Sequence, residues 1–68
     1  MIKEKRNSKK YNQEKMSQLL GISLRQYVRI DNEENLPRRD ILKKLISELE
    51  LSDAEIGKYI RDISNKTA

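Results

Sequence analysis

Arg25 and Arg29 are the residues whose type and spacing best suit recognition of another molecule. They stand four positions apart, so in a helix both guanidinium groups would leave the same face. Gln26 lies between them, and Leu24 and Val28 form a second pair at the same spacing. A guanidinium group donates several hydrogen bonds in a fixed fork, which suits phosphate oxygens and base edges. Because surface arginines are most often simply solvated, the pair gains meaning only from the element that carries it.

The chain lacks the side chains on which most enzymes and metal sites depend. It has no His and no Cys, which removes the commonest general base, thiolate and imidazole metal ligands, and disulfides. There is also no phosphate-cradling glycine loop and no inward pair of carboxylates. We therefore expect no enzymatic activity, no cofactor and no metal. The 68 residues allow one domain, spanning 1–68, and without a secretory signal or membrane span we expect a cytoplasmic protein.

Helical spacing of apolar residues recurs along the chain, whereas no stretch alternates apolar and polar residues for long. The pattern predicts an all-α fold, a compact bundle of about five short helices. Ile2 would anchor the first helix, and the tail 64–68 is expected to fray. The helices are expected, in order, at residues 2–9, 13–20, 23–31, 38–49 and 53–63.

The clearest signals enclose residues 13–31, where two short helices are joined by a tight turn. Asn12 suits the N-cap of the first helix, and Gly21 stands where a left-handed C-cap glycine belongs. Ser23 and Gln26 have the spacing of a capping box that opens the second helix. These signals predict a helix-turn-helix.

The second of these helices has a narrow apolar edge, formed by Tyr27 and Ile30. Ser17 supplies the small residue that is needed where the first helix crosses it closely. The side chains of Arg25 and Arg29 are left outside. A helix that is rigidly held by one narrow edge can enter the major groove of DNA.

Two further helices follow Pro37. The first carries an apolar stripe for the core, namely Ile41, Leu42, Leu45, Ile46 and Leu49. The second begins at a capping box of Ser52 and Glu55. We interpret one face of this last helix as a candidate protein interface and a source of dimer contacts; its residues are Ile56, Tyr59, Ile60 and Ile63.

Charge is distributed unevenly along the chain, whose net charge is +4. The first ten positions contain one acidic residue, Glu4, and five basic residues, which are Lys3, Lys5, Arg6, Lys9 and Lys10. Acidic residues predominate between Glu48 and Asp62. A basic start suits phosphate and an acidic end does not, although a well-charged surface also serves solubility.

The segment NQEKMSQLLGISLRQYVRIDN resembles the helix-turn-helix of the Cro and phage-repressor (Xre-like) family. PRRDILKKLISELELS resembles the fourth helix of that family and its turn into the fifth, so the likeness covers most of residues 6–52. The resemblance implies a lambda-repressor-like fold and sequence-specific binding of double-stranded DNA. It implies a Cro-like transcription repressor from a phage or mobile element, acting as a homodimer in the bacterial cytosol or phage-infected host.

The resemblance also assigns roles to single residues. Side chains facing base edges would be Leu24, Arg25, Gln26, Val28 and Arg29. Contacts to phosphate would come from Asn12, Gln13, Ser23, Asn32 and Arg38. Arg6 and Asp31 stand where the family often has an ion pair, which we interpret as structural.

The chain departs from the family pattern at several positions. Glu33 and Glu34 follow Asn32, where the family usually has a glycine and then often a basic residue, and Lys10 replaces another typical glycine. Lys5 and Arg39 stand at positions that are usually apolar. The two carboxylates, the acidic last helix and the exposed Leu24–Val28 pair favour an alternative. In it the chain is a small antirepressor or modulator that binds a cognate repressor protein.

Overall fold

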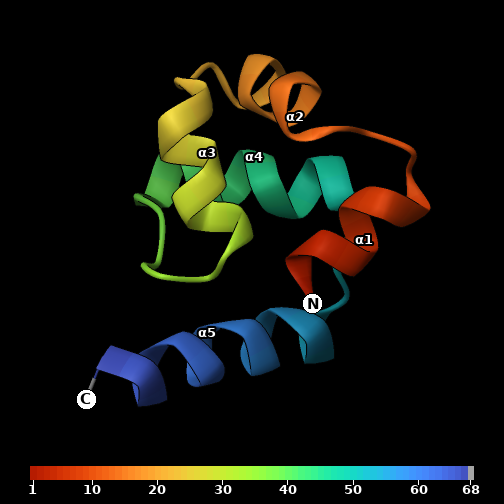
Figure 1. Cartoon of the computed structure of the whole chain (residues 1–68). Helices are drawn as coiled ribbons and strands as arrows, with labels where there is room; N and C mark the ends of the chain where they lie inside the picture. The colour runs from red at the N-terminus through yellow and green to blue at the C-terminus, as the bar shows by residue number, and fades with distance from the viewer. Residues whose placement is uncertain (68) are drawn as a thin grey trace.

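The computed structural model describes the backbone of residues 1–67 and the side chains of residues 1–65 (Figure 1). Within that range the chain forms five helices and no strand, which confirms the predicted all-α fold. The helices are α1 (Ile2–Ser8), α2 (Gln13–Leu20), α3 (Leu24–Asp31), α4 (Arg39–Leu49) and α5 (Asp53–Thr67). None of these helices has the length and apolar character needed to cross a membrane.

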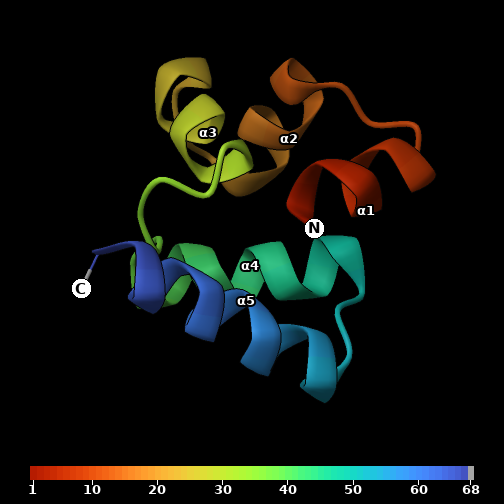
Figure 2. The same cartoon turned by 60° about the horizontal axis from the view of Figure 1, so that its bottom comes forward.

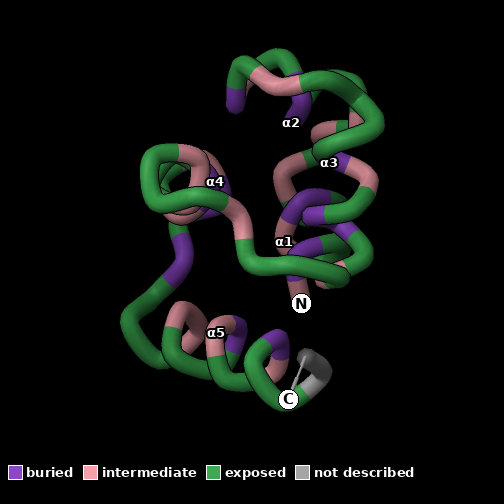
Figure 3. The backbone as a smooth tube through the Cα atoms, turned by 90° about the vertical axis from the view of Figure 1, so that its left-hand side faces the viewer, coloured by how far each residue is buried: buried purple, intermediate pink, exposed green. Residues whose placement is uncertain are grey.

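The helices enclose one small core. In both Figure 1 and Figure 2, α2 and α3 lie at one end of the molecule and α5 lies at the other. Each helix contributes buried side chains, whereas the segment between α3 and α4 is mostly exposed (Figure 3). The core consists of Ile2, Met16, Leu20, Tyr27, Ile30, Leu45, Leu49, Leu51, Tyr59 and Ile63. The predicted apolar edge of α3 and the centre of the α4 stripe are therefore buried as expected.

Local signals set the helix ends as predicted. The Asn12 Oδ1 atom accepts a hydrogen bond from the Lys15 N–H at 2.7 Å, which caps α2. Ser23 and Gln26 form a reciprocal capping box at the start of α3, with both cap hydrogen bonds at 3.1 Å. Ser52 and Glu55 do the same for α5, at 2.9 and 3.2 Å. Each cap satisfies backbone N–H groups that a helix start otherwise leaves unpaired.

The last helix differs from the prediction in two ways. Its backbone stays helical to Thr67, beyond the expected end near Ile63, and Ala68 lies outside the described residues. Tyr59 and Ile63, which we predicted to be part of an exposed interface, are 0% and 2% exposed. That part of the prediction is wrong, because so small a bundle needs the apolar stripe of α5 to complete its own core.

The other two residues of that face are less deeply placed. Ile56 is half-buried and packs against the core, and Ile60 is also half-buried. A dimer surface formed by all four side chains is therefore excluded, since two of them are already inside the protein.

In the part of the chain that the structure describes, three residues other than glycine adopt left-handed backbone conformations. They are Lys10 at φ 61°, Glu33 at φ 55° and Glu50 at φ 52°. Lys10 and Glu33 occupy the two positions at which the resemblance leads us to expect glycine. Both turns therefore have the left-handed geometry that glycine adopts most easily, although neither residue is a glycine. The left-handed conformation costs each of these residues about 1–2 kcal/mol.

Lys10→Gly is expected to raise the free energy of unfolding by about 0.5–1 kcal/mol, because it relieves left-handed strain at an exposed position and offsets the entropy that glycine loses on folding. Urea denaturation followed by circular dichroism measures this change. Lys3→Gly is the matched control, since it removes the same charge from inside α1 and should destabilise the protein by about 1 kcal/mol. Equal destabilisation by both substitutions would contradict the strain at Lys10.

Candidate nucleic-acid interface

A tight turn fixes α3 against α2. Gly21 adopts φ 70°, and its N–H donates to the Gln18 carbonyl at 3.2 Å. The Ile22 N–H donates back to the Ser17 carbonyl at 3.0 Å, which completes a Schellman motif. Ser17 itself is 4% exposed, as expected of a small residue at a close crossing. The direction of α3 thus follows from hydrogen bonds within the turn.

A buried carboxylate holds the other end of α3. Arg6 donates to Asp31 through Nε at 2.9 Å and through Nη2 at 3.2 Å, so the expected ion pair is present and has two hydrogen bonds. The Tyr27 hydroxyl donates to the same carboxylate at 3.0 Å. Asp31 is 1% exposed and Arg6 is 9% exposed. We call these three residues, together with Gln13, whose side chain also donates to Asp31, the Asp31 network.

The charge of Asp31 is stabilised by its neighbours. Burial by itself raises the pKa of this carboxyl group, but the hydrogen bonds from Arg6, Gln13 and Tyr27 outweigh burial and hold the pKa below its ordinary value. Burial, followed by the nearby Asp31 charge, raises the pKa of Tyr27. Both groups therefore keep a single protonation state at neutral pH, and the network is a fixed structural element.

Gln13 joins this network, which the sequence did not indicate. Its Nε2 atom donates to Asp31 Oδ2 at 3.0 Å, so the first residue of α2 is tied to the last residue of α3. The side chain of Gln13, a residue that we predicted to contact phosphate, thus donates a hydrogen bond within the protein. The backbone N–H of Gln13 stands in the first turn of α2, where no helical carbonyl accepts it.

The outer side of α3 carries most of the predicted base-edge residues. Arg25, Gln26 and Arg29 are exposed, and Leu24 is 46% exposed. Val28 was predicted to be exposed, but it is half-buried. Gln26 Oε1 accepts hydrogen bonds from the Ser23 N–H and hydroxyl, which fixes this amide and leaves its N–H groups as donors.

The remaining residues predicted to contact phosphate lie at helix ends. Asn12, Ser23 and Arg38 are the N-caps of α2, α3 and α4, and Asn32 is the C-cap of α3. All four are exposed. Helix N-termini present unpaired N–H groups and a positive dipole end, so the first three positions are suited to anions.

The sequence suggested that Glu33 faces solvent, but its side chain is turned toward the protein. Its carboxylate accepts a hydrogen bond from the Met1 ammonium group at 3.0 Å, and its side chain is 15% exposed. It also lies close enough to Tyr59 that its charge adds to burial in raising the pKa of that hydroxyl. Of the two carboxylates that follow Asn32, Glu33 is thus turned inward, contrary to our expectation, and only Glu34 is exposed.

The basic N-terminal segment is partly neutralised within the molecule. Lys5 Nζ lies 2.6 Å from the Glu55 carboxylate, and Lys9 pairs with Glu50. The hydrogen bond from Lys5 and the one from the Ser52 backbone lower the pKa of Glu55. The sequence had pointed to residues 1–10 as the positive surface. Lys3 and Lys10 remain exposed there. Further exposed cations stand on or beside α2, α3 and α4, namely Lys15, Arg25, Arg29, Arg38, Arg39, Lys43 and Lys44, and the exposed carboxylates of Glu14, Glu34 and Asp40 stand on the same segment.

Comparison with known proteins yields one family. The sequence profile of a family described as helix-turn-helix matches residues 2–56, which include α1–α4 and the start of α5. No curated protein and no solved structure matches the chain.

Proposed function

Because the chain belongs to the Cro and phage-repressor (Xre-like) helix-turn-helix family of DNA-binding transcription regulators, we propose that it is a sequence-specific repressor of the Cro kind. In this proposal it comes from a phage or mobile element. The observation that carries the proposal is the outer side of α3, where Arg25, Gln26 and Arg29 are exposed on a helix held at both ends.

In the proposed complex α3 enters the major groove of DNA. Arg25 and Arg29 donate to guanine O6 and N7, and the amide of Gln26 lies close to the base edges. Leu24 meets a thymine methyl group, joined by the outer part of Val28. These side chains supply the sequence preference.

Contacts to the DNA backbone set the register of α3. The starts of α2, α3 and α4 approach phosphates through Asn12, Gln13, Ser23 and Arg38, and Asn32 contacts phosphate at the other end of α3. At Gln13 the backbone N–H is the proposed donor, since its side chain is held by Asp31.

We further propose that two copies bind a pseudo-palindrome. A single domain of this size covers few base pairs, and helix-turn-helix proteins place their two recognition helices about one DNA turn apart, roughly 34–36 Å. Sedimentation of the complex should therefore give two chains per duplex.

The test is a titration of the protein into labelled DNA from its own upstream region, followed by fluorescence anisotropy at several salt concentrations. We expect the upstream duplex to bind more tightly than a scrambled duplex, and both affinities to fall linearly on logarithmic axes as salt rises. The difference between the duplexes reports base reading, and the slope reports phosphate contacts. Equal affinity for both duplexes at every salt concentration would rule out sequence-specific repression.

A further inference from the structure

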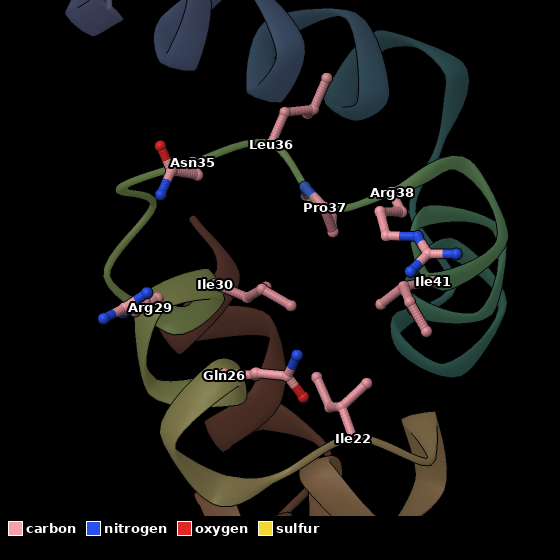
Figure 4. A pocket seen from close by; sticks show the side chains of 9 residues that line it. All are labelled: Ile22, Gln26, Arg29, Ile30, Asn35, Leu36, Pro37, Arg38 and Ile41. Atoms are coloured by element: carbon pink, nitrogen blue, oxygen red, sulfur yellow. The ribbon is translucent and has the colours of Figure 1, made fainter.

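A mainly apolar groove lies beside α3, between that helix and the segment that leads into α4 (Figure 4). Its volume is about 200 Å³. Its apolar lining comes from Ile22, Ile30, Leu36, Pro37 and Ile41. Figure 4 shows Ile22, Ile30, Pro37 and Ile41 around one space, with Leu36 at its rim and its side chain directed away from the other four. An apolar cavity of about 150 Å³ holds benzene, so this groove has room for one large apolar side chain.

The two charged residues that line the groove are both cations. Arg29 and Arg38 stand at its edge with the neutral side chains of Gln26 and Asn35. Asp40 lies 3.9 Å from Arg38, but both side chains are largely exposed, at 67% and 88%, so this pair is weak. An apolar centre flanked by guanidinium groups complements an apolar anchor flanked by carboxylates.

From this complementarity we infer that the groove is the docking site of an acidic segment of another protein, which inserts one aromatic or aliphatic side chain between α3 and Pro37. A second copy of the chain would fit less well, because both of its exposed leucines lie near arginines. Leu24 precedes Arg25, and Leu36 lies two residues before Arg38. If a leucine of a second copy entered the groove, the arginine beside that leucine would approach Arg29 and Arg38, and the like charges would repel.

Occupation of the groove competes with DNA, and this part of the inference rests on the proposed function. Gln26 and Arg29 line the groove and are also proposed base readers. An acidic segment that pairs with Arg29 therefore removes a guanidinium from the reading face and adds negative charge where DNA phosphates would approach. The groove thus gives a partner protein direct control over DNA binding.

The two exposed leucines allow the inference to be separated from DNA binding. Leu36 lines the groove and is not among the proposed DNA contacts, whereas Leu24 is a proposed base-edge residue outside the groove. Their exposed fractions are similar, at 42% and 46%, so Leu36→Ser and Leu24→Ser are matched in burial and chemistry. Circular dichroism should show that both variants fold.

The probe is a synthetic peptide with one phenylalanine flanked on each side by three glutamates, labelled for anisotropy. We expect it to bind the wild-type chain at micromolar to millimolar concentration and to displace the upstream duplex. Leu36→Ser should weaken peptide binding about tenfold and change DNA affinity less than about twofold, and Leu24→Ser should do the reverse. The same peptide with alanine in place of phenylalanine should bind about tenfold more weakly.

Several results would overturn the inference. One is no peptide binding at millimolar concentration, and another is equal binding of the phenylalanine and alanine peptides. A third is a loss of peptide binding in Leu24→Ser but not in Leu36→Ser, which would place the peptide on the DNA-reading face. If the peptide binds through Leu36 while the upstream duplex binds no better than the scrambled one, the docking site stands and the proposed repressor function fails.

Discussion

Replacement of Asp31 by alanine is expected to lower the free energy of unfolding by about 3–5 kcal/mol. The substitution would leave the Arg6 guanidinium, which is 9% exposed, without its carboxylate. It would also remove the acceptor of the Tyr27 hydroxyl and of the Gln13 amide. A buried cation without its partner is among the most destabilising changes in a protein, and the total stability of so small a domain is only several kcal/mol.

Urea denaturation at neutral pH measures the loss. The matched control is Asp40→Ala, which removes an aspartate whose side chain is 67% exposed and lies 3.9 Å from Arg38. That change should cost about 0–1 kcal/mol. If Asp31→Ala were no more destabilising than Asp40→Ala, the Asp31 network would not hold the bundle together.

The stabilisation by Asp31 should also depend on pH. Because the native pKa of this carboxyl lies below its ordinary value, ionised Asp31 stabilises the folded state fully above the unfolded pKa of about 3.9. This stabilisation is lost as pH falls through the lower native pKa. The stability difference between the wild type and Asp31→Asn should therefore be constant from about pH 5 to 8 and shrink below about pH 4.

The double substitution Arg25→Ala and Arg29→Ala is expected to abolish the preference for the upstream duplex over the scrambled one. A good arginine contact to guanine contributes about 1–3 kcal/mol of discrimination, so two contacts together contribute about thirtyfold or more. Both side chains are exposed, so thermal unfolding should show little change.

Lys43→Ala with Lys44→Ala is the control for charge alone, since it also removes two exposed cations, here from α4. This control should weaken binding to both duplexes and keep the ratio of their affinities. If the two double variants lost affinity equally for both duplexes, Arg25 and Arg29 would act as general phosphate contacts and α3 would not read bases.

The sequence predicted the features of the fold that depend on near neighbours. The limits of α2 and α3 follow from Asn12, Gly21 and Ser23, each of which acts on backbone groups within a few residues. The buried edge of α3 follows from helical spacing, because the period of a helix alone decides that Tyr27 and Ile30 share a side.

The features that sequence reasoning missed depend on segments far apart in the chain. Gln13 reaches Asp31 across 18 positions, and Lys5 reaches Glu55 across a longer interval. The inward direction of Glu33 depends on the position of the Met1 ammonium group, which precedes α1 and is 32 positions away in the sequence. Tyr59 has the same helical spacing whether its face meets the core or a partner, so its burial could be decided only by the packing of α5.

The pairing of Lys5 and Lys9 with Glu55 and Glu50 changes how the molecule meets a polyanion at a distance. These pairs cancel part of the charge of residues 1–10, while the segment from α2 to α4 carries seven exposed cations against three exposed carboxylates, Glu14, Glu34 and Asp40. Most of the excess of exposed positive charge in the described residues therefore falls on the segment that contains α3. In the field of a polyanion such a molecule turns before contact, so that a larger share of diffusive encounters begins in the productive orientation. This guidance weakens as added salt shortens the range of the field.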